Sequence, residues 1–402
     1  MKTLTYKIID GKSNGYLALL GILGLFVLGG AAAFFFMEHS GHWASGMTNQ
    51  IVWGVPHVFA VFLIVAASGA LNVASISSVF NRKLYKPLAP LSAVLSVTLL
   101  LGGLTVLVLD LGRPDRLIVA MTEYNFKSIF AWNMILYNGF LAIVGVYIWF
   151  MLERKMNKYS RYAGFVAFFW RLLLTTGTGA IFGFLVARQA YDAAIMAPMF
   201  IIMSFAYGLA IFIVVTIASY SWTNRPLGDV IFERLRKLLG VFIGAVFYFV
   251  AVYHLTNLYA TEHHGVERFI LLDGGIYTQL FWIGQVIIGM LIPLALIFHP
   301  ALSKSRNALV VASILVVIGG LAQMYVTIIG GQAFPLDMFP GKIVESSFFD
   351  GGINSYIPSL PELALGIGGF ALSLIMIALA VKILRLLPAD LSDAEISPHH
   401  KA

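Results

Sequence analysis

The chain has 402 residues, of which 59% are hydrophobic types and only 11% are charged. Soluble domains carry about 25% charged residues, so a water-soluble globular protein is excluded, and the high apolar content excludes a disordered chain. Because the chain has no cysteine, it has no disulfides, thiolate-bound zinc or iron–sulfur cluster of its own. Any cluster that works with it would sit on another subunit. The remaining class is a helical protein that crosses a membrane many times.

Ten stretches are long and apolar enough to cross a bilayer, which requires roughly 20 mainly apolar residues. They are 16–37, 53–79, 89–110, 128–151, 163–190, 195–221, 237–260, 277–298, 306–330 and 360–386. The first follows three lysines, as a signal peptide would, but its apolar run is longer than a signal sequence and continues past the small residues 31–33. We therefore predict a retained first span and an all-α polytopic membrane protein with ten transmembrane helices.

Lysine and arginine are distributed unequally between the two sides of this topology. Nineteen of the 26 lie at the two termini or in the loops that follow spans 2, 4, 6 and 8, and six lie in the other loops and the flanking helix ends. Acidic residues divide seven to twelve between the same two sides. Positive residues stay on the cytoplasmic side, so both termini are predicted to face the cytoplasm, with the protein in the cytoplasmic (inner) membrane. The net charge of +7 follows from this topology and lipid contact, and does not indicate nucleic-acid binding.

No soluble domain interrupts the spans. We predict one membrane domain over 1–388 and a polar, mobile cytoplasmic tail over 389–402. The longest irregular segment, 331–359 on the outer side, is rich in Gly, Pro, Phe and Ser and is predicted to form a packed cap.

Polar residues are costly in hydrocarbon, so they are expected to face the bundle interior or a cavity. One helical stripe of the second span is polar. Its members are His57, Ser68, Asn72 and Ser75. His57 lies about one turn inside the outer surface, where its near-neutral pKa would suit proton transfer with a quinol headgroup. The alternative is an interfacial histidine bonded to a loop carbonyl.

The third span ends in the sequence DLGRPDR, residues 110–116. Asp110 and Arg113 could build a rigid ionic corner at the outer surface, because a glycine turn lies between them and Pro114 follows Arg113. The alternative is a structural turn held by an Asp–Arg pair.

The fifth span is predicted to carry a polar face that extends through most of the hydrocarbon thickness. Its members are Arg171, Thr175, Thr178 and Gln189. Such a face could line a hydrated proton path or form a structural hydrogen-bonded stripe. A buried arginine costs about 2.5–3.5 kcal/mol at a helix centre, so Arg171 is expected to have a partner. Arg188 and Asp192 have i, i+4 spacing and are expected to pair.

Two further groups of polar residues lie near the outer ends of spans. The seventh span ends in His254, Asn257, Tyr259, Glu262, His263 and His264. His57 and His254 could together ligate a b-type haem, although no further motif supports it, and the adjacent pair after Glu262 suits a solvated loop. Ser359, Pro361 and Glu362 have the spacing of a helix N-terminal capping box, which assigns Glu362 to capping first and proton chemistry second.

The sequence Asp110-Leu111-Gly112-Arg113-Pro114, followed by Asn125, Ser128, Trp132 and Asn133, resembles the signature of the NrfD/PsrC (polysulfide reductase membrane subunit) superfamily. Its ten-span branch includes the HybB-like hydrogenase subunits and DsrP, a subunit of the DsrMKJOP complex of dissimilatory sulfur metabolism. Three stretches look most like the DsrP group: 49–57, 186–192 and 330–336.

This resemblance implies two four-helix bundles, spans 2–5 and 6–9, flanked by spans 1 and 10. It also implies a pocket for menaquinone or ubiquinone near the outer surface, beside a docked ferredoxin-like iron–sulfur subunit (DsrO-like), with DsrM, DsrK and DsrJ as further partners. In the family a histidine or asparagine of the second span contacts the quinone. Aligning the small residues 67–69 places that position near Ala60, one turn from His57. The prediction that His57 contacts the quinone therefore rests on the chemistry of histidine and not on the family alignment.

The leading hypothesis is a quinone-reactive membrane subunit that supplies a pocket and proton donors, not a redox metal, and is not catalytic alone. Trp53 and His57 would border the headgroup, Asp110 and Arg113 would hold the pocket corner or the partner loop, and Asn133 would add a hydrogen bond. The alternatives are a redox-linked proton translocator that uses the polar face of the fifth span, and a purely structural anchor for soluble redox subunits.

Overall fold

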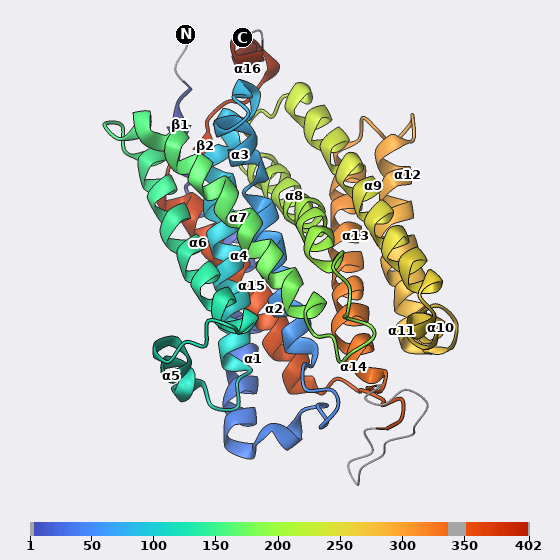
Figure 1. The fold of residues 1–402 in the computed structure, drawn as a ribbon. Helices are drawn as coiled ribbons and strands as arrows, with labels where there is room; N and C mark the ends of the chain where they lie inside the picture. Colours follow the sequence, from blue (N-terminus) through green and yellow to red (C-terminus); the bar gives the residue numbers. More distant parts are fainter. Residues whose placement is uncertain (1–3, 337–350, 401–402) are drawn as a thin grey trace.

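The computed structural model describes residues 4–336 and 351–400, with side chains up to residue 396. Residues 337–350, which include part of the predicted outer cap, lie outside the described residues. Ten helices of the described chain are long and apolar enough to cross a membrane, which confirms the ten predicted spans (Figure 1). They are Asn14–Ser40, Val55–Ser78, Lys83–Leu109, Ile129–Leu152, Asn157–Gly183, Met196–Trp222, Asp229–Tyr259, Ile276–Phe298, Arg306–Ala333 and Leu360–Ile383.

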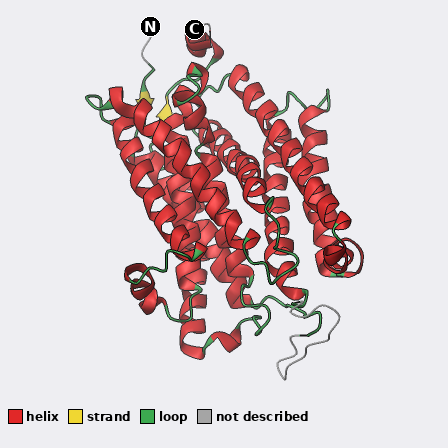
Figure 2. Ribbon diagram, in the orientation of Figure 1, coloured by secondary structure: helices red, strands yellow, loops and turns green. Residues whose placement is uncertain are grey.

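Six of the spans consist mainly of one helix each, and other spans contain breaks. Helices make up most of the described chain, with two short strands near the termini (Figure 2). The single helices are α1 (Asn14–Ser40), α6 (Ile129–Leu152), α7 (Ser160–Gly183), α8 (Met196–Trp222), α9 (Asp229–Tyr259) and α15 (Leu360–Ile383). The second span is α2 (Val55–Ala70) and α3 (Asn72–Ser78), and the third is a 3₁₀ turn (Lys83–Leu88) followed by α4 (Ala89–Leu109). The eighth and ninth contain π-helical stretches: α11 (Ile276–Gln279), η7 (Leu280–Leu291) and α12 (Ile292–Phe298), then α13 (Arg306–Tyr325), η8 (Val326–Gly330) and α14 (Gly331–Ala333). Short surface helices are α5 (Leu117–Thr122), α10 (His264–Arg268) and α16 (Asp393–His400).

The spans form two bundles that share an interface. In the first bundle α2 and α3 pack with α4 and α7, and α6 packs on α4 and α7. In the second bundle α8 packs with α9 and α13, and α13 also contacts η7 and α12. α2 also packs on α8 and α13 and so joins the bundles. The tenth span, α15, lies against α2 and α4 and carries α1 on its other side. This agrees with the predicted pair of bundles with flanking first and tenth spans.

Two glycines permit the close approach of the bundles. A Cβ added to Gly69 of α2 would lie 1.5 Å from the carbonyl oxygen of Ser204, and one on Gly208 of α8 would lie 2.1 Å from the backbone nitrogen of Ala70. Neither position can hold a larger side chain without moving a helix. The small residues of the second span therefore serve the helix contact predicted for them.

The two termini lie at the same end of the bundle (Figure 1). β1 (Tyr6–Lys7) pairs antiparallel with β2 (Leu387–Pro388). The tail beyond β2 was predicted to be mobile, but Leu391 and Ile396 are buried and the Asp393 carboxylate accepts hydrogen bonds from the first backbone amides of α9. The tail up to Ile396 is therefore docked. We call the opposite end of the bundle, where α2 begins and α4 ends, the distal end.

The fifth span is shorter than predicted. α7 ends at Gly183, and Gln189 lies in the turns that follow. The prediction that Arg171 and Gln189 share one continuous helix face is therefore wrong.

Candidate functional site

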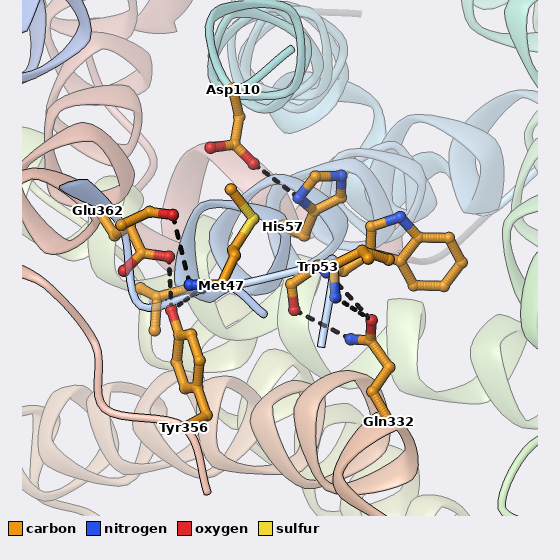
Figure 3. A network of polar contacts seen from close by, with 10 residues as sticks. Met47, Trp53, His57, Asp110, Gln332, Tyr356 and Glu362 are labelled. Atoms are coloured by element: carbon orange, nitrogen blue, oxygen red, sulfur yellow. Dashed lines mark hydrogen bonds and ion pairs between the residues drawn. The ribbon is translucent and has the colours of Figure 1, made fainter. Parts of the chain in front are cut away.

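His57 and Asp110 meet at the distal end of the first bundle. α2 begins at Val55 with Pro56 in its first turn, which places His57 at the helix entrance, and Asp110 is the C-terminal cap of α4. His57 Nδ1 lies 2.8 Å from Asp110 Oδ2 (Figure 3). The histidine side chain is 16% exposed and the aspartate side chain 1%. The structure thus brings together two predicted site residues that are far apart in the sequence.

Asp110 is incompletely satisfied. Its contact with His57 has the distance of an ion pair but not the alignment of a hydrogen bond, and neither buried carboxylate oxygen accepts a hydrogen bond from any described residue. A buried acceptor left without a donor costs about 1–3 kcal/mol. The pair can therefore accept a hydroxyl or another donor from a bound molecule.

An aromatic wall borders this pair. The Trp53 ring stacks on His57 with centroids 6.1 Å apart and planes 24° apart, and it also contacts Phe182 edge-on and Phe130 at a tilt. Phe130 is 46% exposed at the start of α6, so the wall extends from the partly buried histidine to the surface. A flat ring could lie against these side chains.

Gln332 fixes the backbone that carries Trp53. Its Oε1 accepts hydrogen bonds from the amides of Val52 and Trp53, at 2.9 and 3.0 Å, and its Nε2 donates to the carbonyls of Trp53 and Ile328 (Figure 3). Gln332 is buried at the start of α14. A side chain of the second bundle thus positions the ring that stacks on His57.

Glu362 holds the other side of the same segment. It forms the predicted capping box with Ser359 and also accepts from the Gly46 amide and the Tyr356 hydroxyl, both at 2.7 Å. Tyr356 Oη in turn accepts from the Val55 amide at the start of α2. Burial, followed by the charge of Glu362, raises the pKa of Tyr356, so the phenol remains a donor. Structural capping, the first role predicted for Glu362, is confirmed.

Arg113 is not part of the buried pair. Its guanidinium donates two hydrogen bonds of 3.0 Å to the carboxylate of Asp115, and both side chains are exposed. The hydrogen bond from Arg113 lowers the pKa of Asp115, and the same bond raises the pKa of Arg113. The prediction of an Asp110–Arg113 corner is therefore corrected: Asp110 turns inward to His57, whereas Arg113 pairs on the surface.

Asn133 links helices instead of joining His57. Its Nδ2 donates to the carbonyls of Ile129 and Gly177, and its buried Oδ1 has no partner among the described residues. Asn133 thus ties α6 to α7 and keeps one free acceptor, one turn beyond the exposed ring of Phe130.

Arg171, which is buried, and Arg188, which is half-buried, have partners other than those predicted by charge. Arg171 donates a long hydrogen bond to the carbonyl of Ser68 and lies over the rings of Phe168 and Phe205 at 5.0 and 5.1 Å, with no carboxylate in the described residues beside it. Arg188 donates to the carbonyls of Gln50 and Gln332. Its expected ion pair with Asp192 does not form.

The sequence analysis missed Glu267. This carboxylate is fully buried and lies 2.7 Å from His254 Nδ1. An acidic residue two positions before the apolar run 269–272 was the available signal. His57 and His254 lie in different bundles, each against its own carboxylate, so the structure does not bring them together as haem ligands. Within the described residues, no group of three His, Asp or Glu could hold a metal ion.

Residues 43–336 match the family described as Polysulphide reductase, NrfD. The chain belongs to this family. Among its relatives, the Hdr-like menaquinol oxidoreductase integral membrane subunit of Archaeoglobus fulgidus is 29% identical over 95% of this chain and 96% of its own. A subunit of the selenate reductase of Mesobacillus selenatarsenatis is 21% identical, over 96% and 95% of the two proteins. Protein NrfD of Escherichia coli is 24% identical, over 62% and 85%. This NrfD-family protein is thus a multi-pass membrane protein, and it matches two of these relatives along nearly its whole length.

Proposed function

We propose that this NrfD-family protein is the quinone-reactive membrane subunit of a multi-subunit respiratory oxidoreductase. Its relatives include a menaquinol oxidoreductase membrane subunit and part of the polysulfide reductase of Wolinella succinogenes. The absence of cysteine requires that iron–sulfur clusters belong to partners.

One observation carries this proposal: the buried, donor-deficient carboxylate of Asp110 beside His57 and the Trp53 ring. A quinol offers what the site needs, two hydroxyl donors on a flat ring with an apolar tail. A purely structural anchor has no use for an unsatisfied buried acceptor, which lowers stability.

The chemistry assigned to this subunit is proton transfer. Oxidation of a quinol releases two protons and two electrons. The hydroxyls would donate to Asp110 in turn, and the Asp110–His57 pair would take the two protons one after the other and pass each to water at the distal surface. The electrons would pass to an iron–sulfur cluster on a partner. The same groups would return protons to the ring when electrons flow toward the quinone. Asn133 Oδ1 would serve as a further acceptor toward the α6 side of the pocket.

The partner is proposed to be a ferredoxin-like iron–sulfur subunit at the distal end, with Arg113 and Asp115 as exposed contacts for its loop. The charge distribution supports a distal end outside the cytoplasmic membrane and both termini in the cytoplasm. We assign the chain more finely to a Dsr-type sulfur-metabolism complex that uses menaquinone or ubiquinone. Its further subunits would be DsrO-, DsrM-, DsrK- and DsrJ-like. This assignment rests on the stretches 49–57, 186–192 and 330–336. Mass spectrometry of the complex purified from native membranes tests the assignment, and partners of another type would contradict it.

The site is tested by fluorescence quenching of a quinol analogue in the purified complex, compared among His57→Ala, Asp110→Asn and the exposed control Glu123→Gln. We expect analogue binding at least about tenfold weaker in the first two, since a charge-assisted hydrogen bond contributes about 1.5–3 kcal/mol, and unchanged binding in the control. Unchanged binding and turnover in both site variants would remove His57 and Asp110 from the site.

A further inference from the structure

The segment that joins α1 to α2, residues 41–54, is held in place on both sides of Met47. Before Met47, the Gly46 amide donates a 2.7 Å hydrogen bond to the carboxylate of Glu362. After it, Gln50 Nε2 donates to two backbone carbonyls of the ninth span, at 3.1 and 3.0 Å. The backbone that carries Met47 therefore has little freedom to move, and any movement at this position belongs to the side chain.

The Met47 side chain packs at the entrance of α2. A Cβ added to Gly54, the N-terminal cap of α2, would lie 3.4 Å from Met47 Cγ, with the side chains of Glu362 and Tyr356 closer still. Glycine at this position thus leaves the room that the methionine occupies. The amide of His57 donates to the Gly54 carbonyl at 3.1 Å, so Met47 packs within one helical turn of the site histidine.

From this point the thioether of Met47 extends toward the His57–Asp110 pair, on the other side of His57 from the Trp53 ring (Figure 3). Met47 is half-buried, whereas the Asp110 side chain is 1% exposed. A thioether has no hydrogen to donate. The group directed at the donor-deficient carboxylate is therefore one that cannot satisfy it.

A methionine is well suited to give way at such a place. Its side chain is unbranched, has three rotatable bonds and makes favourable contacts with aromatic rings. Since Met47 is already partly exposed at the distal surface, its thioether can turn outward while the backbone stays in place. A ring that brings a hydroxyl to Asp110 must take part of the space of this thioether, and a wider ring must displace it further.

We propose that Met47 is a specificity-determining residue of the quinol site, a movable cover over Asp110 that limits how wide a ring can reach the carboxylate. The ligands it distinguishes are quinols with one ring and quinols with two fused rings. Met47 acts by rotation of its side chain, and no bond to it is made or broken. This inference rests on the proposed quinol chemistry and adds the residue that selects among quinols.

The test is stopped-flow fluorescence quenching in the purified complex, with a benzoquinol and a naphthoquinol analogue that carry the same tail. Association rate constants are compared among wild type, Met47→Ala, Met47→Leu and the control Asn49→Ala, because Asn49 is exposed in the same segment. Met47→Ala removes the cover, so association should rise about fivefold for the naphthoquinol and less than about twofold for the benzoquinol. Met47→Leu nearly conserves the volume but is branched and stiffer, so naphthoquinol association should fall about threefold. The control should match wild type.

The two analogues separate a selective cover from ordinary packing. Unchanged association of both in Met47→Ala would overturn the inference, as would an equal rise for both, because ring width would then not matter. If Met47→Ala loosens the segment and lowers the thermal unfolding temperature, Met47→Leu decides, and unchanged naphthoquinol association in that variant would overturn the inference. A wild-type complex that binds neither analogue would instead contradict the proposed function.

Discussion

The two bundles carry the same type of pair at the same end but satisfy it differently. In the first bundle His57 and Asp110 are 2.8 Å apart, and the carboxylate has no aligned donor among the described residues. In the second, His254 and Glu267 are 2.7 Å apart, and Asn257 binds the other oxygen. A carboxylate that lacks a donor is suited to bind a molecule from outside, whereas a carboxylate with both oxygens bonded to neighbouring side chains needs no outside ligand. The difference supports the proposal that the ligand binds in the first bundle.

The largest effect is expected on quinol turnover, where the two histidines should differ. His57→Gln in the intact complex should lower quinol turnover about 10²- to 10⁴-fold, the usual contribution of a general acid or base. His254→Gln should leave uncoupled turnover within about threefold. Steady-state assays of the two variants side by side measure this, and equal losses would mean that the pairs do not have different roles.

Thermal stability should show the opposite order, with the larger loss at the His254–Glu267 pair. Glu267→Ala leaves Asn257 and His254 buried without their acceptor, which costs about 1–3 kcal/mol, so the thermal unfolding temperature of the purified protein should fall by several degrees. Asp110→Ala removes an acceptor that was unsatisfied already and should have the smaller effect. A larger loss of stability in Asp110→Ala would contradict the observed difference in hydrogen bonding.

Gln332→Ala should have a smaller, local effect on the first site. The variant frees the amides of Val52 and Trp53, so the Trp53 ring loses its fixed position over His57. We expect quinol-analogue affinity to fall about three- to tenfold, equivalent to roughly 0.7–1.4 kcal/mol. Titration of the analogue measures it, with Gln279→Ala as a matched control because Gln279 is exposed in α11 of the second bundle. Unchanged affinity would show that the ring does not border the ligand.

The smallest effect on quinone binding is expected from Arg113→Ala. Arg113 lowers the pKa of Asp115, so the pair contributes above the ordinary carboxyl pKa and is lost as pH falls through the lowered value; both groups are charged at about pH 6–8. Analogue affinity in that range should change less than about twofold, because the Arg113 side chain does not touch the buried pair. Retention of the iron–sulfur partner during gel filtration should fall, and unaltered retention would argue against Arg113 as a docking contact.

The spans could be predicted from sequence because hydropathy depends only on local composition, and the Glu362 cap because its partner Ser359 lies within one helical turn. The partners of Asp110 and Arg113 could not be predicted from the sequence. Local charge favoured pairing them, but the end of α4 turns Asp110 inward to His57, which lies on another helix. Glu267 was missed for a similar reason, since its partners lie 10 and 13 residues away and become neighbours only when α10 folds back on α9.

The ladder between β1 and β2 has a practical consequence. Tyr6 and Pro388 are paired residues, so the segments just before the first span and just after the tenth are already adjacent in space. A short linker could join them, and the polypeptide could be reopened at another loop on that side without changing how many times it crosses the bilayer. The order of the helices along the chain could thus be changed without changing their arrangement in the membrane.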